Sequence, residues 1–153
     1  DGTIAETRPA TRAILQTLSG RAAAAPFVAI VIDYGYSKPS FGDTVQAVKQ
    51  HRFTGLFDAP GETDLTAHVD FSALATEAMD LNLAVHGPMP MGQWLLKLGL
   101  ETRAQQLLRR ASAREAQDLV SRIARLIDPA QMGAHFKVTA LSSGGLAALP
   151  PFS

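Results

Sequence analysis

The side chains best suited to chemistry lie between residues 33 and 70 of the chain. They are carboxylates, imidazoles and one phenol that could hold a cationic substrate and accept a proton from it, and the candidate catalytic residues are Asp33, Tyr34, Asp43, His51, Asp64, His68 and Asp70. Carboxylates pair with cationic donors, and a positioned imidazole or carboxylate can take up a proton. A structural role is open for Asp43, Asp64 and Asp70, because aspartate also forms turns and caps helices.

Patterns for other kinds of catalysis are weak or missing. His68, Asp70 and His135 have the composition of a two-histidine, one-carboxylate iron site, but such sites normally lie in a double-sheet β-barrel. The sequence contains no HExxH pair, no G-x-S-x-G elbow and no glycine-rich phosphate loop. We therefore predict no metal site, and we interpret His86 as a structural histidine.

One element must position the candidate side chains. It is the apolar run Phe27–Ile32, which leads directly into Asp33, Tyr34 and Gly35. Such a short run predicts a strand buried on both faces in the middle of a parallel sheet. In these sheets ligands bind beyond the carboxyl ends of the strands. We therefore expect the site at the end of this strand, although a tight turn formed by Asp33 and Gly35 explains the same residues.

The rest of the chain predicts helices, short strands and loops around this strand. In chain order they are a helix from Thr7 to Gly20, one or two helical turns over Thr44–Gln50, an irregular connection over Phe53–Asp64, a helix capped by Asp70 or Ser72, a strand over Leu83–Val85, a helix over Met91–Gly99, helical segments over Glu101–Ile127 with a break near Ala113, and a strand over Met132–Leu141. Arg103, Arg110 and Arg114 form either a solvated helix surface or a basic docking surface.

Composition fits one globular domain. The chain has 153 residues, of which 46% are hydrophobic and 18% charged. Fourteen basic and fourteen acidic residues give a net charge of zero, so no nucleic acid partner is expected. No apolar run is long enough for a membrane span, and no cysteine is present for a disulfide. We expect a cytoplasmic, bacterial protein, and because Asp1 is not a methionine we expect a fragment of a longer chain.

Four segments closely resemble the C-terminal half of the MidA family of S-adenosylmethionine-dependent methyltransferases. They are Val31–Tyr36, Gly42–Ala47 with His51, Pro60–Phe71, and Gln131–Gly133 with Phe136–Val138. The mitochondrial member of that family is an arginine methyltransferase that acts on a subunit of respiratory complex I during assembly. The resemblance covers nearly the whole chain.

The resemblance implies an α/β fold, namely the C-terminal part of a class I (Rossmann-like) methyltransferase domain that spans residues 1–153. Phe27–Asp33 would be the fifth strand of that fold, Leu83–His86 the sixth and Phe136–Leu141 the antiparallel seventh, with a helical insertion at about residues 91–128. The family's glycine-rich loop and first four strands have no counterpart here. The resemblance therefore implies that S-adenosylmethionine is bound mainly by an absent N-terminal half, so the chain alone is expected to be inactive and no cofactor-binding residue is assigned.

The resemblance also implies the chemistry of the candidate residues. An arginine acceptor needs carboxylates for its guanidinium donors, and we expect Asp43 and Asp70 to contribute most. Tyr34 would form a wall of the site, and His51 or His68 would accept the proton. The family tends to carry Thr-Gln where this chain has Pro90-Met91, a departure from the family pattern that bears on one polar contact near the substrate.

The expected partners follow from the same comparison. A protein substrate, with a complex I subunit as the candidate, would be methylated by the completed enzyme. The strand Phe27–Asp33 would leave an open sheet edge, which proteins normally cover, so association with its own N-terminal half or a homodimer is expected. The alternative function is a non-catalytic binding module that assists assembly of a respiratory complex through the helices of Glu101–Ile127.

Overall fold

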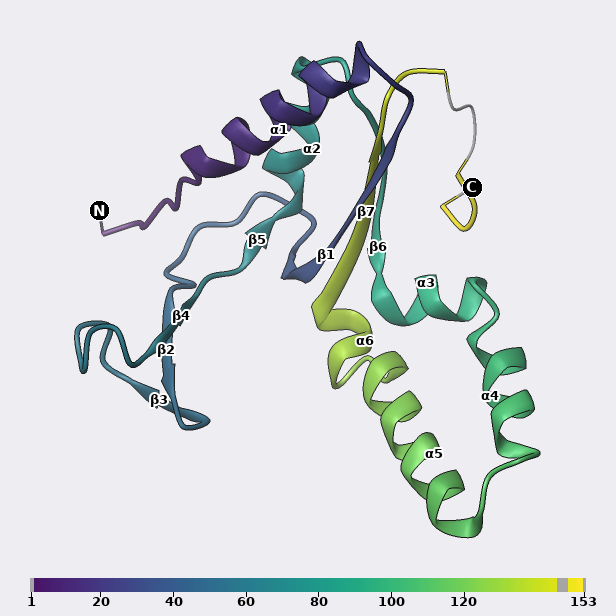
Figure 1. The fold of residues 1–153 in the computed structure, drawn as a ribbon. Coiled ribbons are helices and arrows are strands. Elements are labelled where there is room, and N and C mark those ends of the chain that lie inside the picture. Colours follow the sequence, from purple (N-terminus) through teal and green to yellow (C-terminus); the bar gives the residue numbers. More distant parts are fainter. Residues whose placement is uncertain (1, 146–148, 153) are drawn as a thin grey trace.

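The computed structural model describes residues 2–145 and 149–152 (Figure 1). Its elements in chain order are α1 (Pro9–Ala22), β1 (Val28–Tyr36), β2 (Gln46–Lys49), β3 (Arg52–Thr54), β4 (Asp64–Thr66), β5 (Val69–Asp70), α2 (Phe71–Asp80), β6 (Ala84–Pro90), α3 (Met91–Lys97), α4 (Leu100–Leu108), α5 (Ala113–Ile127), α6 (Met132–His135) and β7 (Phe136–Ser142). They form a four-stranded main sheet, a three-stranded small sheet and helices.

The main sheet has the strand order β5-β1-β7-β6. β7 is antiparallel to both of its neighbours. Ser142 of β7 lies opposite Val28 of β1 on one side and opposite Ala84 of β6 on the other. β1 and β6 therefore run in the same direction, with the last strand of the chain inserted between them (Figure 1). The expected α/β class and the antiparallel strand near residues 136–141 are both confirmed.

The prediction that β1 is buried on both faces was wrong for the described residues. Val28, Ile30 and Ile32 are 43%, 54% and 45% exposed, whereas Ala29 and Val31 pack on the core. Successive side chains of a strand point to opposite faces, and the core that α1 and α2 form covers only one of them. The far edge of β1 is also largely open, because β5 pairs with it only at its last two residues.

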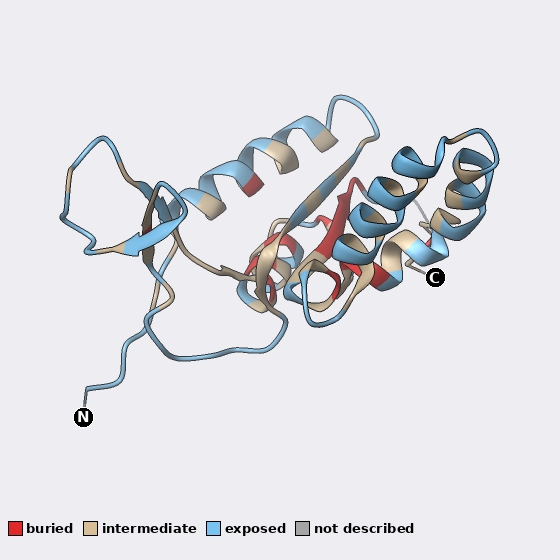
Figure 2. Ribbon diagram, turned by 90° about the horizontal axis from the view of Figure 1, so that it is seen from below, coloured by how far each residue is buried: buried red, intermediate tan, exposed pale blue. Residues whose placement is uncertain are grey.

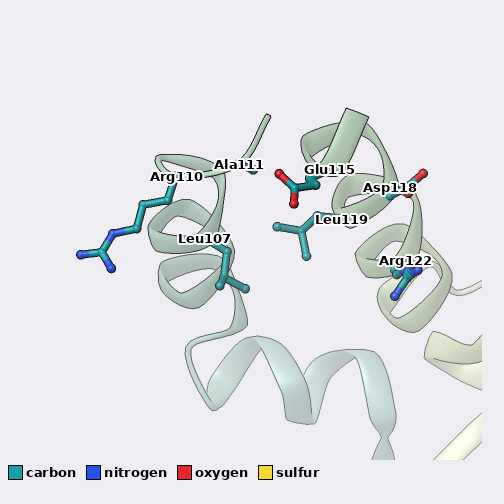
Figure 3. Close-up of a pocket in the computed structure, with 7 residues that line it drawn as sticks. All are labelled: Leu107, Arg110, Ala111, Glu115, Asp118, Leu119 and Arg122. Atoms are coloured by element: carbon teal, nitrogen blue, oxygen red, sulfur yellow. The ribbon is translucent and has the colours of Figure 1, made fainter. Parts of the chain in front are cut away.

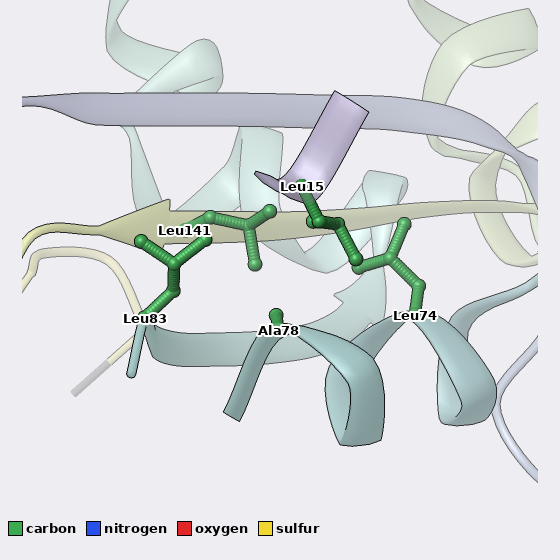
Figure 4. Close-up of a cluster of buried hydrophobic side chains, with 5 residues drawn as sticks. All are labelled: Leu15, Leu74, Ala78, Leu83 and Leu141. Atoms are coloured by element: carbon green, nitrogen blue, oxygen red, sulfur yellow. The ribbon is translucent and has the colours of Figure 1, made fainter. Parts of the chain in front are cut away.

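The core joins α1, α2 and the main sheet. Its buried members are Leu15, Leu74, Ala78, Leu83 and Leu141 (Figure 4). The helix α1 begins with Pro9 at its first position, as expected, but it continues past Gly20 because Leu18 and Ala22 still pack against the core. The predicted cap of α2 is confirmed, since Asp70 Oδ1 accepts a hydrogen bond of 2.9 Å from the backbone N–H of Ala73.

Residues 46–66 form the small sheet, with the order β3-β2-β4 and antiparallel pairing throughout. The helical turns predicted over Thr44–Gln50 were therefore wrong. Val45 and Val48 have a helical spacing, but β2 hydrogen-bonds to strands on both sides and Ala47 is buried at 2% exposure. The small sheet stands beside the main sheet in Figure 1.

Four helices, α3 to α6, lie between β6 and β7 in the chain, and α3 to α5 extend away from the main sheet (Figure 1). The predicted break between the two long helical segments is confirmed, and Ser112 and Glu115 form a capping box that starts α5. The strand predicted from Met132 begins only at Phe136, because residues 132–135 form the short helix α6. Gly133 there packs so closely on Ile127 that a side chain would overlap the backbone.

Burial is concentrated on β7 and the helices beside it, while much of α4, α5 and the small sheet is exposed (Figure 2). Within residues 2–145 and 149–152, no helix is long and apolar enough to cross a membrane.

Candidate functional site

A cavity of about 360 Å³ lies at the carboxyl end of β1. It is bordered by the end of β1, by β2 and β4 of the small sheet and by the segment that leads into β7, and its lining residues are Tyr34, Gly35, Gln46, Thr66, His68, Gln131, His135, Phe136 and Lys137. The position agrees with the expected site, because loops from separate parts of the chain converge beyond the end of this strand.

Three rings form one wall of the cavity. Tyr34 and Phe136 are directly opposite each other on β1 and β7, and their rings meet edge to face at a centroid distance of 5.6 Å. Tyr34 makes a second edge-to-face contact with His68, at 5.4 Å. These geometries are favourable for aromatic pairs. The strand pairing thus positions Tyr34, and Tyr34 in turn contacts the imidazole.

A hydrogen-bond ring holds the backbone of His68. The His68 N–H donates to Thr44 Oγ1 at 3.1 Å, and the Thr44 hydroxyl donates to Glu6 at 2.6 Å. Arg8 donates both to the Glu6 carboxylate, at 2.6 Å, and to the His68 carbonyl. The Thr44 hydroxyl is the main cause that holds the pKa of Glu6 below its usual value, with help from the Thr44 N–H and Arg8.

Gln131 is oriented by Asp128. The Gln131 side-chain nitrogen donates to Asp128 Oδ2 at 3.2 Å, which leaves the Gln131 carbonyl oxygen able to accept a hydrogen bond in the cavity. The backbone N–H of Ala130 donates to the other carboxylate oxygen at 2.9 Å. These two bonds, that of Ala130 first, lower the pKa of Asp128.

Lys137, near the start of β7, is a cationic residue of the cavity lining. Its ammonium donates to the backbone carbonyls of Ala134 and His135, the latter at 3.4 Å. Burial lowers the pKa of Lys137. The ammonium is thus turned toward the end of α6 by its own hydrogen bonds.

The structure brings two of the seven predicted catalytic residues together, Tyr34 and His68. Asp33 precedes Tyr34 on β1, so its side chain starts on the opposite face, and its carboxylate accepts a hydrogen bond of 2.8 Å from the Tyr34 N–H. Asp70 caps α2 and lines a separate cavity of about 200 Å³ with Arg8 and Glu77.

The other three predicted residues are exposed and lie outside the cavity lining. Asp43 accepts a hydrogen bond of 3.1 Å from the backbone N–H of Val45, His51 lies in the turn between β2 and β3, and Asp64 lies on β4. No carboxylate lines the cavity among the described residues. The catalytic roles assigned to all seven residues remain predictions.

Sequence reasoning did not single out most of the cavity lining as functional. The missed residues are Gln46, Gln131, Phe136 and Lys137, while Thr66 was recognised as part of a polar cluster with Asp64, His68 and Asp70 but was given no catalytic role. Each of them lies inside a segment that carries the MidA resemblance, which is the signal that could have identified them. His135 appeared only in the iron-site pattern, and the described part of the chain holds no cluster of three metal-binding side chains.

A further cavity, of about 420 Å³, lies between α4 and α5 (Figure 3). Leu107 comes from α4 and Leu119 from α5, while Arg110 points away from the space between the helices. Glu115, which lines the cavity, also completes the capping box of α5. We assign no chemistry to this cavity.

The sequence profile of a family described as "Putative S-adenosyl-L-methionine-dependent methyltransferase" matches residues 1–89, more than half of the chain. The chain belongs to this family. The expected relationship to the MidA methyltransferases is confirmed by the match and by the relatives that follow.

Several named relatives of this methyltransferase family resemble the chain. The mitochondrial protein arginine methyltransferase NDUFAF7 homolog of Drosophila melanogaster is 39% identical over 126 residues, which cover 79% of this chain and 28% of that protein. The human mitochondrial protein arginine methyltransferase NDUFAF7 is 33% identical over 137 residues, or 89% of this chain and 31% of that protein. The chain therefore spans less than a third of the length of either relative.

Two solved structures share the fold. A protein from Burkholderia thailandensis with bound S-adenosyl-homocysteine has a TM-score of 0.80 and 29% identity, over 94% of this chain and 38% of that one. A second solved structure from the same organism has a TM-score of 0.76 and 28% identity, over 91% of this chain and 39% of that one. The expected Rossmann-like fold class is thereby confirmed.

Proposed function

We propose that the chain forms the acceptor side of an S-adenosylmethionine-dependent methyltransferase that modifies an arginine side chain of a protein. The observation that carries the proposal is the cavity at the end of β1, walled by Tyr34, His68 and Phe136, in a member of this family. Arginine as the acceptor is supported by the names of the relatives.

The cavity suits the methyl-bearing end of the cofactor better than its nucleoside. The sequence has no G-x-G loop that could approach a nucleotide, whereas the rings of Tyr34 and Phe136 border the cavity. Aromatic rings attract cations, and S-adenosylmethionine, when bound, supplies a methyl group on a positively charged sulfur. We therefore assign Tyr34 and Phe136 to the sulfonium end, and the remainder of the cofactor to residues outside this chain.

The acceptor would be held by neutral oxygens. A guanidinium presents a fork of N–H donors, and the residues that line the same cavity include Gln46, Thr66 and Gln131, whose side chains carry amide or hydroxyl oxygens. Of these, Gln131 is already oriented by its hydrogen bond to Asp128. The predicted carboxylates Asp43 and Asp70 would then act from outside the cavity lining.

His68 is the proposed proton acceptor. Methylation of a guanidinium nitrogen releases one proton, and the pKa of free guanidinium is too high for unassisted loss at neutral pH. The His68 ring lines the cavity and is positioned by Tyr34, while its backbone is held by Thr44 and Arg8. His51, the other predicted acceptor, lies in the exposed hairpin turn.

We further propose a complex I subunit as the first protein substrate to test, and the bacterial cytoplasm as the location. Both follow from the MidA resemblance. Coverage of the open edge of β1, by an N-terminal half or by a second copy, is part of the same proposal.

The test is a methyl-transfer assay on the full-length protein, with labelled S-adenosylmethionine and a short peptide that contains one arginine. We expect transfer to the arginine peptide, no transfer to the same peptide with lysine, and a loss of about 100-fold in kcat for His68→Gln. His51→Gln, in the exposed turn, should leave kcat nearly unchanged. If His51→Gln has the larger effect, the proton acceptor is reassigned. Peptide binding without transfer by the wild type would favour the non-catalytic binding module.

A further inference from the structure

One face of the small sheet continues outward from the cavity. Gln46 on β2 is opposite Thr66 on β4, and both line the cavity. Two residues further along β2, Val48 is opposite Phe53 on β3 and Asp64 on β4. Residues that are directly opposite, or two apart on one strand, have side chains on the same face. These five side chains therefore share one face, which we call the Phe53 face.

The outer part of the Phe53 face combines an apolar and an acidic side chain that are accessible to a partner. Phe53 is 78% exposed, and Val48 beside it is half-buried. Asp64 is exposed, and within the described residues it has no cationic group within 4 Å. β3 and β4 are the two edge strands of the small sheet, which projects from the main sheet in Figure 1. The Phe53 face therefore has an exposed side chain on each side of β2, Phe53 on β3 and Asp64 on β4.

We propose that the Phe53 face binds the polypeptide segment of the substrate that carries the methyl acceptor. Val48 and Phe53 would hold an apolar side chain of that segment, and Asp64 a cationic one. This inference rests on the proposed function, because the cavity has to receive the acceptor. Two observations support this occupant: the face is continuous with the cavity wall that would receive the acceptor, and the exposed Asp64 carboxylate has no ion-pair partner among the described residues, so it is free to take a cationic side chain.

The geometry specifies the spacing in the substrate. Gln46 and Val48 are two residues apart on β2, which corresponds to about 7 Å along a strand. An extended segment along β2 repeats this spacing, since its side chains also share a side at every second residue. We therefore expect the apolar side chain two residues from the acceptor.

The probe is a pair of short synthetic peptides with one central arginine and either phenylalanine or serine two residues away. In the full-length protein we expect the phenylalanine peptide to have the lower KM. Phe53→Ser should raise that KM about tenfold, leave kcat nearly unchanged and abolish the preference between the peptides. The matched control is Phe57→Ser, because Phe57 is 90% exposed and lies beyond β3, outside this face. Asp64→Asn should weaken binding and reduce its dependence on salt.

Three outcomes would overturn the inference. The first is an unchanged peptide preference in Phe53→Ser. The second is an equal effect of Phe57→Ser, which would indicate a general loss of apolar surface. The third is a lower thermal midpoint or a lower sedimentation mass in Phe53→Ser, which would show that the protein itself or a second copy covers the face.

Peptide binding measured by fluorescence anisotropy separates this inference from the proposed function. Binding that depends on Phe53 without any methyl transfer would support the docking face and contradict the enzyme. Methyl transfer that is indifferent to Phe53 would support the enzyme and contradict the docking face.

Discussion

Glu6 accepts two hydrogen bonds from Thr44, one from the backbone N–H at 2.7 Å and one from the hydroxyl at 2.6 Å. The same hydroxyl accepts the backbone N–H of His68 at 3.1 Å. The segment before α1 therefore fixes the loop that presents His68 to the cavity, although Glu6 and Thr44 are 38 residues apart in the sequence.

Glu6→Gln tests this connection. We expect the free energy of unfolding at neutral pH to fall by about 1–2 kcal/mol, because hydrogen bonds to a charged carboxylate are lost. Urea denaturation measures the change. Glu62→Gln is the matched control, since Glu62 makes an ion pair with Lys49 but its side chain is 70% exposed, and about 0.5 kcal/mol or less is expected there. Equal effects of the two changes would contradict a special role for Glu6.

The stability of the protein should depend on pH through the Glu6 carboxylate. The pKa of Glu6 is lower in the folded chain than its ordinary value of 4.5. A lowered folded-state pKa gives stabilisation that is fully present above the unfolded pKa and is lost as the pH falls through the folded one. Acid titration of the wild type should therefore show a loss of stability below about pH 4.5 that is smaller in Glu6→Gln. Parallel curves would assign that loss to other carboxylates.

Tyr34→Ala should lower both the stability of the protein and its methyl-transfer activity. The change removes the ring contacts with His68 and Phe136, and we expect a loss of about 1–3 kcal/mol in stability. Tyr34→Phe keeps both ring contacts, so it should retain stability within about 0.5 kcal/mol. Methyl transfer is then measured at a temperature where both variants are folded. A large loss of activity in Tyr34→Ala alone would indicate that the ring positions His68. A large loss of activity in Tyr34→Phe would indicate a direct role of the hydroxyl.

Gln131→Ala should weaken acceptor binding more than it weakens the fold. The Gln131 oxygen faces a guanidinium in the proposed complex, and one such hydrogen bond corresponds to a rise of about five- to tenfold in KM for the arginine peptide. Gln117→Ala on the exposed surface of α5 is the control. An unchanged KM in Gln131→Ala would remove Gln131 from the site.

Gly35→Ala should be the most damaging small substitution near the site. A Cβ at Gly35 would overlap the backbone carbonyl of Val69, its partner on β5, so the pairing of β1 and β5 must open. We expect a loss of about 2–4 kcal/mol in thermal or urea unfolding. Gly20→Ala in α1 meets no atom within 4 Å and should instead stabilise the chain by about 0.5–1 kcal/mol. A stable Gly35→Ala variant would contradict the close approach.

The main sheet could be predicted from the sequence because its strands are marked locally. β1 is a continuous apolar run, and β7 alternates after Phe136. The sequence did not show that one face of β1 is exposed. An apolar run alone does not tell whether helices cover one face of a strand or both. The small sheet was missed because each of its two strand pairs is only three residue pairs long, and β2 reaches β4 only across β3 and the loop that follows it.

The candidate site was predicted in part for a related reason. Two residues with reactive side chains stand out in the sequence. Tyr34 comes just after the apolar run of β1, and His68 lies in a cluster of polar residues. Gln46, Gln131 and Lys137 carry no such local mark, and only the tertiary arrangement of β2, α6 and β7 brings them to the same cavity. The aspartates were overestimated as cavity residues, because Asp43 and Asp70 bond to nearby backbone N–H groups in this structure.

The pairing of β1 with β7 also has a consequence for synthesis. Residues 37–135 separate the two strands, and at about 5–20 residues per second the ribosome needs roughly 5–20 s to make them. During that interval β1 has emerged with Ile30 and Ile32 but without its main partner in this part of the fold. A nascent chain is most open to chaperone capture, or to premature pairing with another strand, while such a segment waits. Slowing or speeding translation between α3 and α5 would therefore change the yield of folded protein without changing any residue.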